Sequence, residues 1–134
     1  MKSLFRIAAC LMLTASLLCS CSFESKKASK VAESFLTAFF QMDYQTAGSF
    51  CAGDLAAEIQ ESIDDVELPS EEMTELVKEA SMNTTFEITQ VDTKSEKGVA
   101  TVCYVIHPYG NEENVERSML LVKEKGKWLV LQLF

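Results

Sequence analysis

The sequence predicts an α+β domain in which N-terminal helices pack on one face of a four-stranded antiparallel sheet. Apolar residues recur at helical spacing in the first half of the chain. The second half contains four runs rich in β-branched and aromatic residues, joined by short connectors typical of hairpins. Helices followed by hairpin-linked strands are typical of the α+β class, with the helices covering one face of the sheet.

The first half predicts three helical segments. The first begins at Lys30 and has a broad apolar stripe that predicts burial along much of its length. This stripe contains Val31, Ala32, Phe35, Leu36, Phe39 and Phe40. Gly48 and Gly53 interrupt the pattern, and Asp54 is the expected N-cap of a second helix. Its apolar residues are Leu55, Ala56, Ile59 and Ile63. Ser70 is the expected N-cap of the third helix. One face of this helix carries Met73, Leu76, Val77 and Ala80.

The second half predicts four strands. They cover Phe86–Asp92, Val99–Ile106, Val115–Lys123 and Trp128–Phe134. The connectors between them contain Gly, Pro, Asn or Lys, as hairpin loops do. Because the last predicted strand runs to residue 134, we expect residues 130–134 to be held in the sheet.

The N-terminal segment has the pattern of a secretory signal. Lys2 and Arg6 precede an uncharged run over residues 7–18, which is too short for a spanning helix of about 20 apolar residues. The run resembles the signals of bacterial lipoproteins, in which a Leu lies three residues before the lipidated cysteine and a small residue directly before it. Leu18, Ser20 and Cys21 fit this pattern, whereas lipidation of Cys19 would place Leu18 at the small-residue position.

This resemblance divides the chain into three parts. Residues 1–20 are expected to be a signal peptide cleaved between Ser20 and Cys21, and Cys21 is expected to carry the lipid. Residues 21–29 are expected to form a polar spacer, and residues 30–134 the folded domain. The alternative is an ordinary signal peptide in which the cysteines are incidental. Ser22 replaces the Asp that retains enteric lipoproteins at the inner membrane, which favours the outer membrane within the bacterial cell envelope.

Charge and cysteine content limit the partners. Loss of Lys2 and Arg6 leaves 10 basic and 20 acidic residues, a formal net charge of −10. This charge argues against nucleic acid and predicts repulsion from anionic lipid, so acyl chains on Cys21 would supply the membrane attachment. Cys51 and Cys103 would remain free, either to form a disulfide or to lie buried as small apolar residues. Two cysteines and one histidine do not make a metal site by spacing, and no cofactor motif is present.

From about residue 29 to residue 134, the chain resembles small bacterial lipoproteins of the nuclear-transport-factor-two-like superfamily. The resemblance rests on the helix "KVAESFLTAFFQMDYQTAGSFC" and on the terminal hairpin "LLVKEKGKWLVLQLF". It is greatest to an uncharacterised lipoprotein family with this cystatin-like, cone-shaped fold. The resemblance implies a curved sheet wrapped around the first helix, with a pocket between them. Many relatives of this fold form dimers, so a homodimer is among the implied partners.

The same resemblance draws attention to three residues. Enzymes of this fold, such as ketosteroid isomerase and scytalone dehydratase, use carboxylates, tyrosines or histidines that project into an apolar pocket. His107 lies at the end of a predicted strand and shares a face with Cys103, while Asp43 and Tyr44 follow the first helix. In lipoproteins of this type, that dipeptide resembles a helix-ending motif in which the Tyr packs and the Asp caps.

Two functions remain open from the sequence. The favoured one is a non-catalytic, membrane-tethered domain that binds a small apolar ligand or an envelope protein partner. The alternative is a small lyase or isomerase that uses a cone pocket with His107 or Asp43. The first is favoured because a catalytic site needs convergent titratable groups, and the sequence offers only isolated ones.

Overall fold

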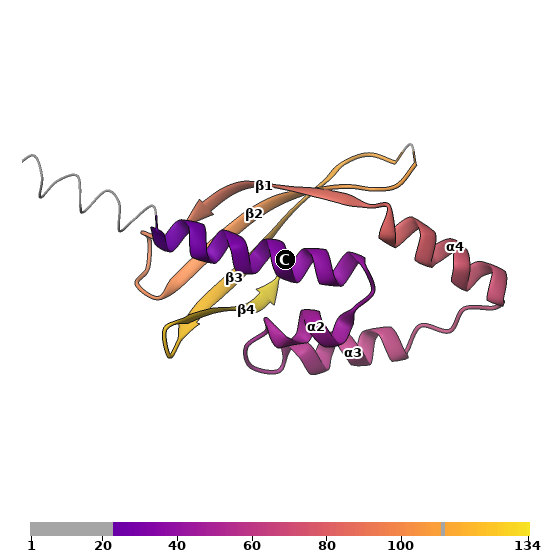
Figure 1. Cartoon of the computed structure of the whole chain (residues 1–134), viewed down its shortest axis with the longest axis horizontal. Coiled ribbons are helices and arrows are strands. Elements are labelled where there is room, and N and C mark those ends of the chain that lie inside the picture. Colours follow the sequence, from indigo (N-terminus) through magenta and orange to yellow (C-terminus); the bar gives the residue numbers. More distant parts are fainter. Residues whose placement is uncertain (1–22, 111) are drawn as a thin grey trace, which may run out of the picture.

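The computed structural model describes residues 23–110 and 112–134. An N-terminal helix over residues 23–40 is followed by three shorter helices and a four-stranded sheet (Figure 1). The shorter helices are α2 (Tyr44–Ser49), α3 (Leu55–Asp64) and α4 (Glu71–Met82). The strands are β1 (Thr85–Asp92), β2 (Val99–His107), β3 (Val115–Glu124) and β4 (Lys127–Leu133). The predicted α+β fold is therefore confirmed, and each strand agrees with its predicted bounds to within one residue.

The sheet is an antiparallel meander in the order β1-β2-β3-β4. Lys125 and Gly126 connect β3 to β4 with φ values of 51° and 80°, the two positive values that a tight type I′ hairpin requires. The segment after α2 runs parallel to the outer edge of β4. There the Ala52 amide donates to the Val130 carbonyl, and the Val130 amide donates to the Phe50 carbonyl, both at 2.7 Å. These bonds protect an otherwise unpaired sheet edge.

The core lies between the N-terminal helix and one face of the sheet. Its largest fully buried side chains are Phe35, Val102, Met119, Leu121 and Val130. Each contributes about 1.5–3 kcal/mol of burial free energy, so this layer dominates the stability of the domain. These side chains fill the centre of the space between the helix and the sheet.

The N-terminal helix begins earlier than the sequence analysis predicts. Residues 23–29, expected to be part of a spacer, are helical, and Ala28 is fully buried. The Glu24 carboxylate accepts hydrogen bonds from Lys123 Nζ and Trp128 Nε1, each at 3.0 Å. The hydrogen bond from Lys123 is the main reason why the pKa of Glu24 is lowered. The polar side chains of this segment therefore fasten the helix to the β3–β4 hairpin.

Two local features differ from the sequence expectations for the helices. The short helix α2 was not predicted, because six residues are too few to show a helical period. Asp54 precedes α3 but makes no side-chain capping bond, whereas the Ser70 hydroxyl accepts a bond from the Met73 amide as predicted. None of the helices among the described residues has the length and apolar character needed to cross a membrane.

Bulges change the direction of side chains in both outer strands. The register shifts between Ile88 and Gln90 in β1, and between Val130 and Gln132 in β4 where they face Leu120 and Leu121. An extra residue bends a strand and reverses the alternation beyond it. In β4 the extra residue is Leu131, and Leu133 consequently lies opposite the buried Met119.

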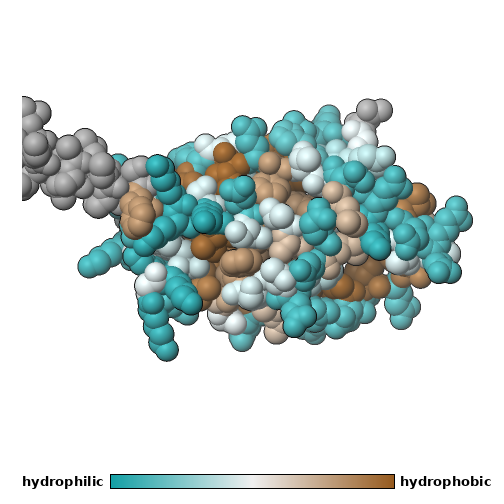
Figure 2. Space-filling model, viewed as in Figure 1, coloured by the Kyte–Doolittle hydropathy of each residue, from teal (hydrophilic) through white to brown (hydrophobic). Residues whose placement is uncertain are grey.

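The helix α4 is the least buried element. In Figure 1 it extends beyond the end of the sheet, and none of its residues is buried. Its C-terminal end is held where the Ser81 hydroxyl donates to the Phe40 carbonyl at 2.8 Å. Figure 2 shows hydrophobic side chains exposed among hydrophilic ones on the side where α3 and α4 lie. The apolar residues of α4 that are more than a third exposed are Met73, Leu76, Val77 and Met82.

Candidate functional site

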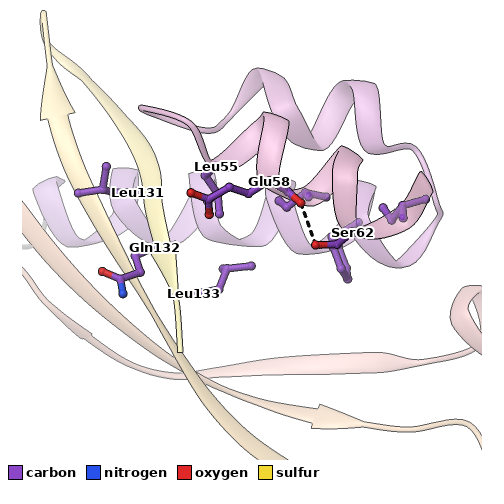
Figure 3. A pocket seen from close by; sticks show the side chains of 9 residues that line it. Leu55, Glu58, Ser62, Leu131, Gln132 and Leu133 are labelled. Atoms are coloured by element: carbon purple, nitrogen blue, oxygen red, sulfur yellow. Dashed lines mark hydrogen bonds between the residues drawn. The ribbon is translucent and has the colours of Figure 1, made fainter. Parts of the chain in front are cut away.

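A cavity of about 410 Å³ lies between α3 and the end of β4 (Figure 3). We call it the α3–β4 cavity. Its lining consists of Phe39, Leu55, Glu58, Ile59, Ser62, Ile63, Leu131, Gln132 and Leu133. Sites for small ligands commonly enclose about 300–1,000 Å³ and have mainly apolar walls with a few polar groups. Both the size and the lining of this cavity fall within that description.

Local sequence positions each wall of the cavity. In α3, apolar residues spaced four apart lie on one face, because they are about one helical turn from each other. They are Leu55, Ile59 and Ile63. In β4 the extra residue Leu131 lines the cavity, and so do Gln132 and Leu133 beyond the bulge. The turn before α3 approaches this strand closely, since a Cβ added to Gly53 would lie 3.5 Å from Leu131 Cδ1.

The chemistry of the cavity favours binding over catalysis. Glu58 is the one lining residue that carries a charge near neutral pH. The Ser62 hydroxyl donates to the Glu58 carbonyl oxygen at 2.8 Å, so it is held by the helix backbone (Figure 3). General acid–base catalysis needs titratable groups placed together around a reacting atom. The lining therefore suits the apolar part of a ligand, with a single carboxylate at hand for a polar group.

Asp43 and Tyr44 have structural contacts outside the lining. The Asp43 carboxylate caps α2 by accepting a bond from the Thr46 amide at 3.2 Å, and bonds from Thr46 lower its pKa. The Tyr44 ring packs edge-on against Phe39 with ring centres 5.6 Å apart. Burial raises the pKa of its hydroxyl. These residues thus support the helix end beside the cavity.

His107 lies on a different part of the surface. It ends β2 opposite Thr85, and its Nε2 atom lies 3.9 Å from a carboxylate oxygen of Glu87. Both side chains are more than a third exposed. Asp43, Tyr44 and His107 are not among the residues that line the α3–β4 cavity. Asp43 instead lines a second cavity, of about 540 Å³, along the N-terminal helix. The expectation that the three residues share one pocket stays a prediction.

Cys51 and Cys103 are not joined by a disulfide. Cys51 lies beside the outer edge of β4, and Cys103 lies on β2, so β3 and β4 separate them. Three strand spacings of about 4.8 Å give about 14 Å, twice the Cα separation of about 7 Å that a disulfide can bridge. The structure therefore corresponds to the alternative of two partly buried free cysteines.

The environment of Cys51 predicts low thiol reactivity. Burial raises the pKa of this thiol from 9.0 to about 11. Because the thiolate is the reactive form, alkylation by iodoacetamide near neutral pH should be about 100-fold slower than in the urea-unfolded chain. Peptide-level mass spectrometry measures the rate at Cys51 directly. Equal rates in the folded and unfolded chains, or a mass showing Cys51 bonded to Cys103, would contradict this placement.

The remaining predicted sites are few. The cleavage and lipidation sites, Ser20 and Cys21, lie outside the described residues. Within residues 23–110 and 112–134, no cluster of three or more His, Cys, Asp or Glu side chains could hold a metal ion. Sequence reasoning identified the apolar face of α3 as a packing surface but missed the cavity that it borders. Leu131 and Leu133 of the last strand were the available signal, but the sequence does not show that this strand ends beside α3.

Comparison of the chain with models of known protein families gave no match, and comparison with curated proteins also gave none. The resemblance to the nuclear-transport-factor-two-like superfamily therefore stays a prediction. The class that the structure itself defines is an α+β domain with a small, largely apolar cavity at the edge of its sheet.

Proposed function

We propose that this chain is a lipid-anchored, non-catalytic binding domain of the bacterial cell envelope, and that it binds the apolar part of a small ligand in the α3–β4 cavity. The observation that carries the binding role is the cavity of about 410 Å³ with six apolar residues in its lining. The resemblance to small lipoproteins supports the same role, because this fold carries binding modules as well as enzymes.

Two further features support the anchored arrangement. The uncharged run over residues 7–18 and the sequence around Cys21 have the pattern of a lipoprotein signal. The N-terminal helix is already formed at Phe23, two residues after Cys21, and is bonded through Glu24 to the sheet. With so short a connection, lipid on Cys21 would hold the domain directly at the membrane surface.

The lyase or isomerase alternative has no comparable support. His107 and Asp43, the residues on which it depends, do not line the α3–β4 cavity. Asp43 is occupied in capping α2, and His107 is paired at long range with the exposed Glu87. The binding function is therefore the single function that we propose.

A neutral apolar probe tests the cavity. N-phenyl-1-naphthylamine should bind the full chain with an increase in fluorescence, and the Leu131→Gln variant should bind it at least about tenfold more weakly, a loss of about 1.4 kcal/mol. The reason is that the added amide must give up water when the probe enters. Leu131 is 38% exposed, so this change should leave the fold intact.

Leu76→Gln is the matched control, because Leu76 on α4 is 54% exposed and lies outside the cavity lining. Its probe affinity should equal that of the unchanged chain. Equal weakening by both substitutions would show that the probe adheres to exposed apolar surface in general. Unchanged affinity of the Leu131 variant would exclude the α3–β4 cavity as the binding site.

A further inference from the structure

The basic residues of the described chain gather at one end of the molecule. Ten of them are described, and only Lys78 and Arg117 lie elsewhere. The other eight are Lys26, Lys27, Lys30, Lys94, Lys97, Lys123, Lys125 and Lys127. We call the surface that they form the lysine end. All eight are exposed to solvent, although the chain as a whole is strongly acidic.

Three separate segments meet at the lysine end. They are the start of the N-terminal helix, the β1–β2 connector and the β3–β4 hairpin, which lie together at one end of the sheet (Figure 1). The Ser25 hydroxyl lies 3.3 Å from the Thr93 hydroxyl, which joins the helix to the β1–β2 connector. Glu24 joins the same helix to the β3–β4 hairpin through Lys123. Hydrophilic side chains project from this end in Figure 2.

The acidic residues at this end are few and partly engaged. They are Glu24, Asp92, Glu96 and Glu124. Eight positive and four negative charges leave a net charge of +4 at the lysine end, against −14 for the rest of the described chain. Glu24 is paired with Lys123, and Asp92 accepts bonds from Ser95 and from the Lys94 amide. Charge is therefore separated along the molecule.

The lysine end also carries an exposed aromatic residue. Phe23 is 57% exposed, and Lys27 Nζ lies 4.3 Å from the centre of its ring. Phe23 is also the described residue closest in sequence to Cys21 and to the uncharged run before it.

We propose that the lysine end is a docking surface for anionic phospholipid headgroups of the membrane. The proposal rests on the proposed lipid anchoring at Cys21, which would bring this end of the domain to the bilayer. Juxtamembrane lysines are attracted to anionic headgroups over roughly a Debye length, about 8 Å at physiological salt. At this end, docking would replace the repulsion expected from the net charge by attraction, because sixteen of the twenty acidic residues would lie farther from the membrane than the lysines.

The rest of the molecule favours a lipid surface over nucleic acid. An extended polyanion would pass from the lysine end along flanks that carry a net charge of −14, whereas a bilayer contacts one end only. Docking also fixes the orientation of the domain. β4 starts at the lysine end with Lys127 and reaches the α3–β4 cavity with Leu131 and Leu133, so the cavity would lie at the end of the strand away from the bilayer.

The single tryptophan allows a direct test. Trp128 follows Lys127 at the lysine end, so energy transfer from it to dansyl-labelled headgroups reports whether this end lies on the membrane. The full chain is mixed with vesicles of phosphatidylcholine, with or without phosphatidylglycerol. Transfer should rise at least about twofold when phosphatidylglycerol is present, and this rise should disappear at high salt.

Two variants with equal loss of charge locate the surface. Lys26→Gln with Lys125→Gln should remove most of the rise, whereas Lys78→Gln with Arg117→Gln should leave it unchanged. Equal losses in both variants, or a rise that survives the first variant, would overturn the proposal. Flotation with vesicles of phosphatidylcholine alone measures attachment through the N-terminal segment separately. Failure of anchoring and failure of docking therefore give different results.

Discussion

Replacing Cys21 with Ser should abolish incorporation of labelled palmitate into this chain, whereas Cys19→Ser should leave incorporation almost unchanged. In the proposed lipoprotein arrangement the lipid would be carried on a cysteine sulfur, which a serine hydroxyl does not replace. Cys21 has Ser20 directly before it and Leu18 three residues before it, while Cys19 has the bulky Leu18 directly before it. The two cysteines are two residues apart, so the second variant is a closely matched control.

Acyl labelling and intact mass are the measurements of choice. Cell fractionation would not separate the variants, because an uncleaved chain keeps the apolar run over residues 7–18. Purified mature protein should have the mass of residues 21–134 plus its lipid, and the Cys21→Ser variant should have the mass of the precursor. Palmitate incorporation that survives Cys21→Ser would contradict the anchor, and its loss in Cys19→Ser would move the anchor to that residue.

Deleting residues 130–134 should unfold the domain. Val130 is fully buried, and burial of such a side chain contributes about 1.5–3 kcal/mol. Its backbone also forms the two bonds that attach residues 50–52 to the sheet. The deletion uncovers one side of β3, including the buried Met119 and Leu121. Since domains of this size are stable by only about 5–15 kcal/mol, these combined losses should remove the folded state at room temperature.

Circular dichroism during heating measures this effect. The truncated chain should show no cooperative transition, whereas the unchanged chain should show one. Phe134→Ala is the control, because Phe134 is 58% exposed and its change should shift the free energy of unfolding by no more than about 0.5 kcal/mol. A truncated chain that unfolds at the temperature of the unchanged chain would contradict the role of β4 in the core.

The strands were predictable because each is a run of β-branched and aromatic residues between polar connectors. The direction of the side chains near the strand ends could not be predicted. Simple alternation from Trp128 places Gln132 with Val130 on the inner face and Leu133 on the outer face. The bulge at Leu131 reverses this and brings Leu133 over Met119. A bulge depends on how the backbones of two strands pair, so the residue pattern of one strand does not predict it.

The start of the first helix was missed for a related reason. Residues 23–29 contain mostly polar residues, and polarity alone predicts a spacer. Ala28 and the tertiary bonds of Glu24 show that this segment is part of the fold. One alanine and one carboxylate do not form an apolar pattern that predicts a helix. Together they nevertheless attach the start of the helix to the sheet.

The two surfaces for which a function is proposed depend on topology rather than on motifs. The α3–β4 cavity combines residues from the end of the N-terminal helix, from α3 and from β4. The lysine end combines three segments that are distant in sequence. The negative net charge of the whole chain therefore gives no sign of this local excess of lysines. His107 and Asp43 were candidate site residues because they are titratable. In the structure His107 lies at a strand end beside Glu87, and Asp43 caps α2, and neither position can be predicted from composition.

Methyl-resolved NMR during titration with N-phenyl-1-naphthylamine tests the proposed binding site most directly. We expect saturable shifts in the methyl groups of Leu55, Ile59, Ile63, Leu131 and Leu133, which come from two elements but line one cavity. The methyl groups of Leu76 and Val77 on α4 should stay unchanged. Shifts confined to α4, or none in the cavity at probe saturation, would contradict the assignment of the α3–β4 cavity as the ligand site.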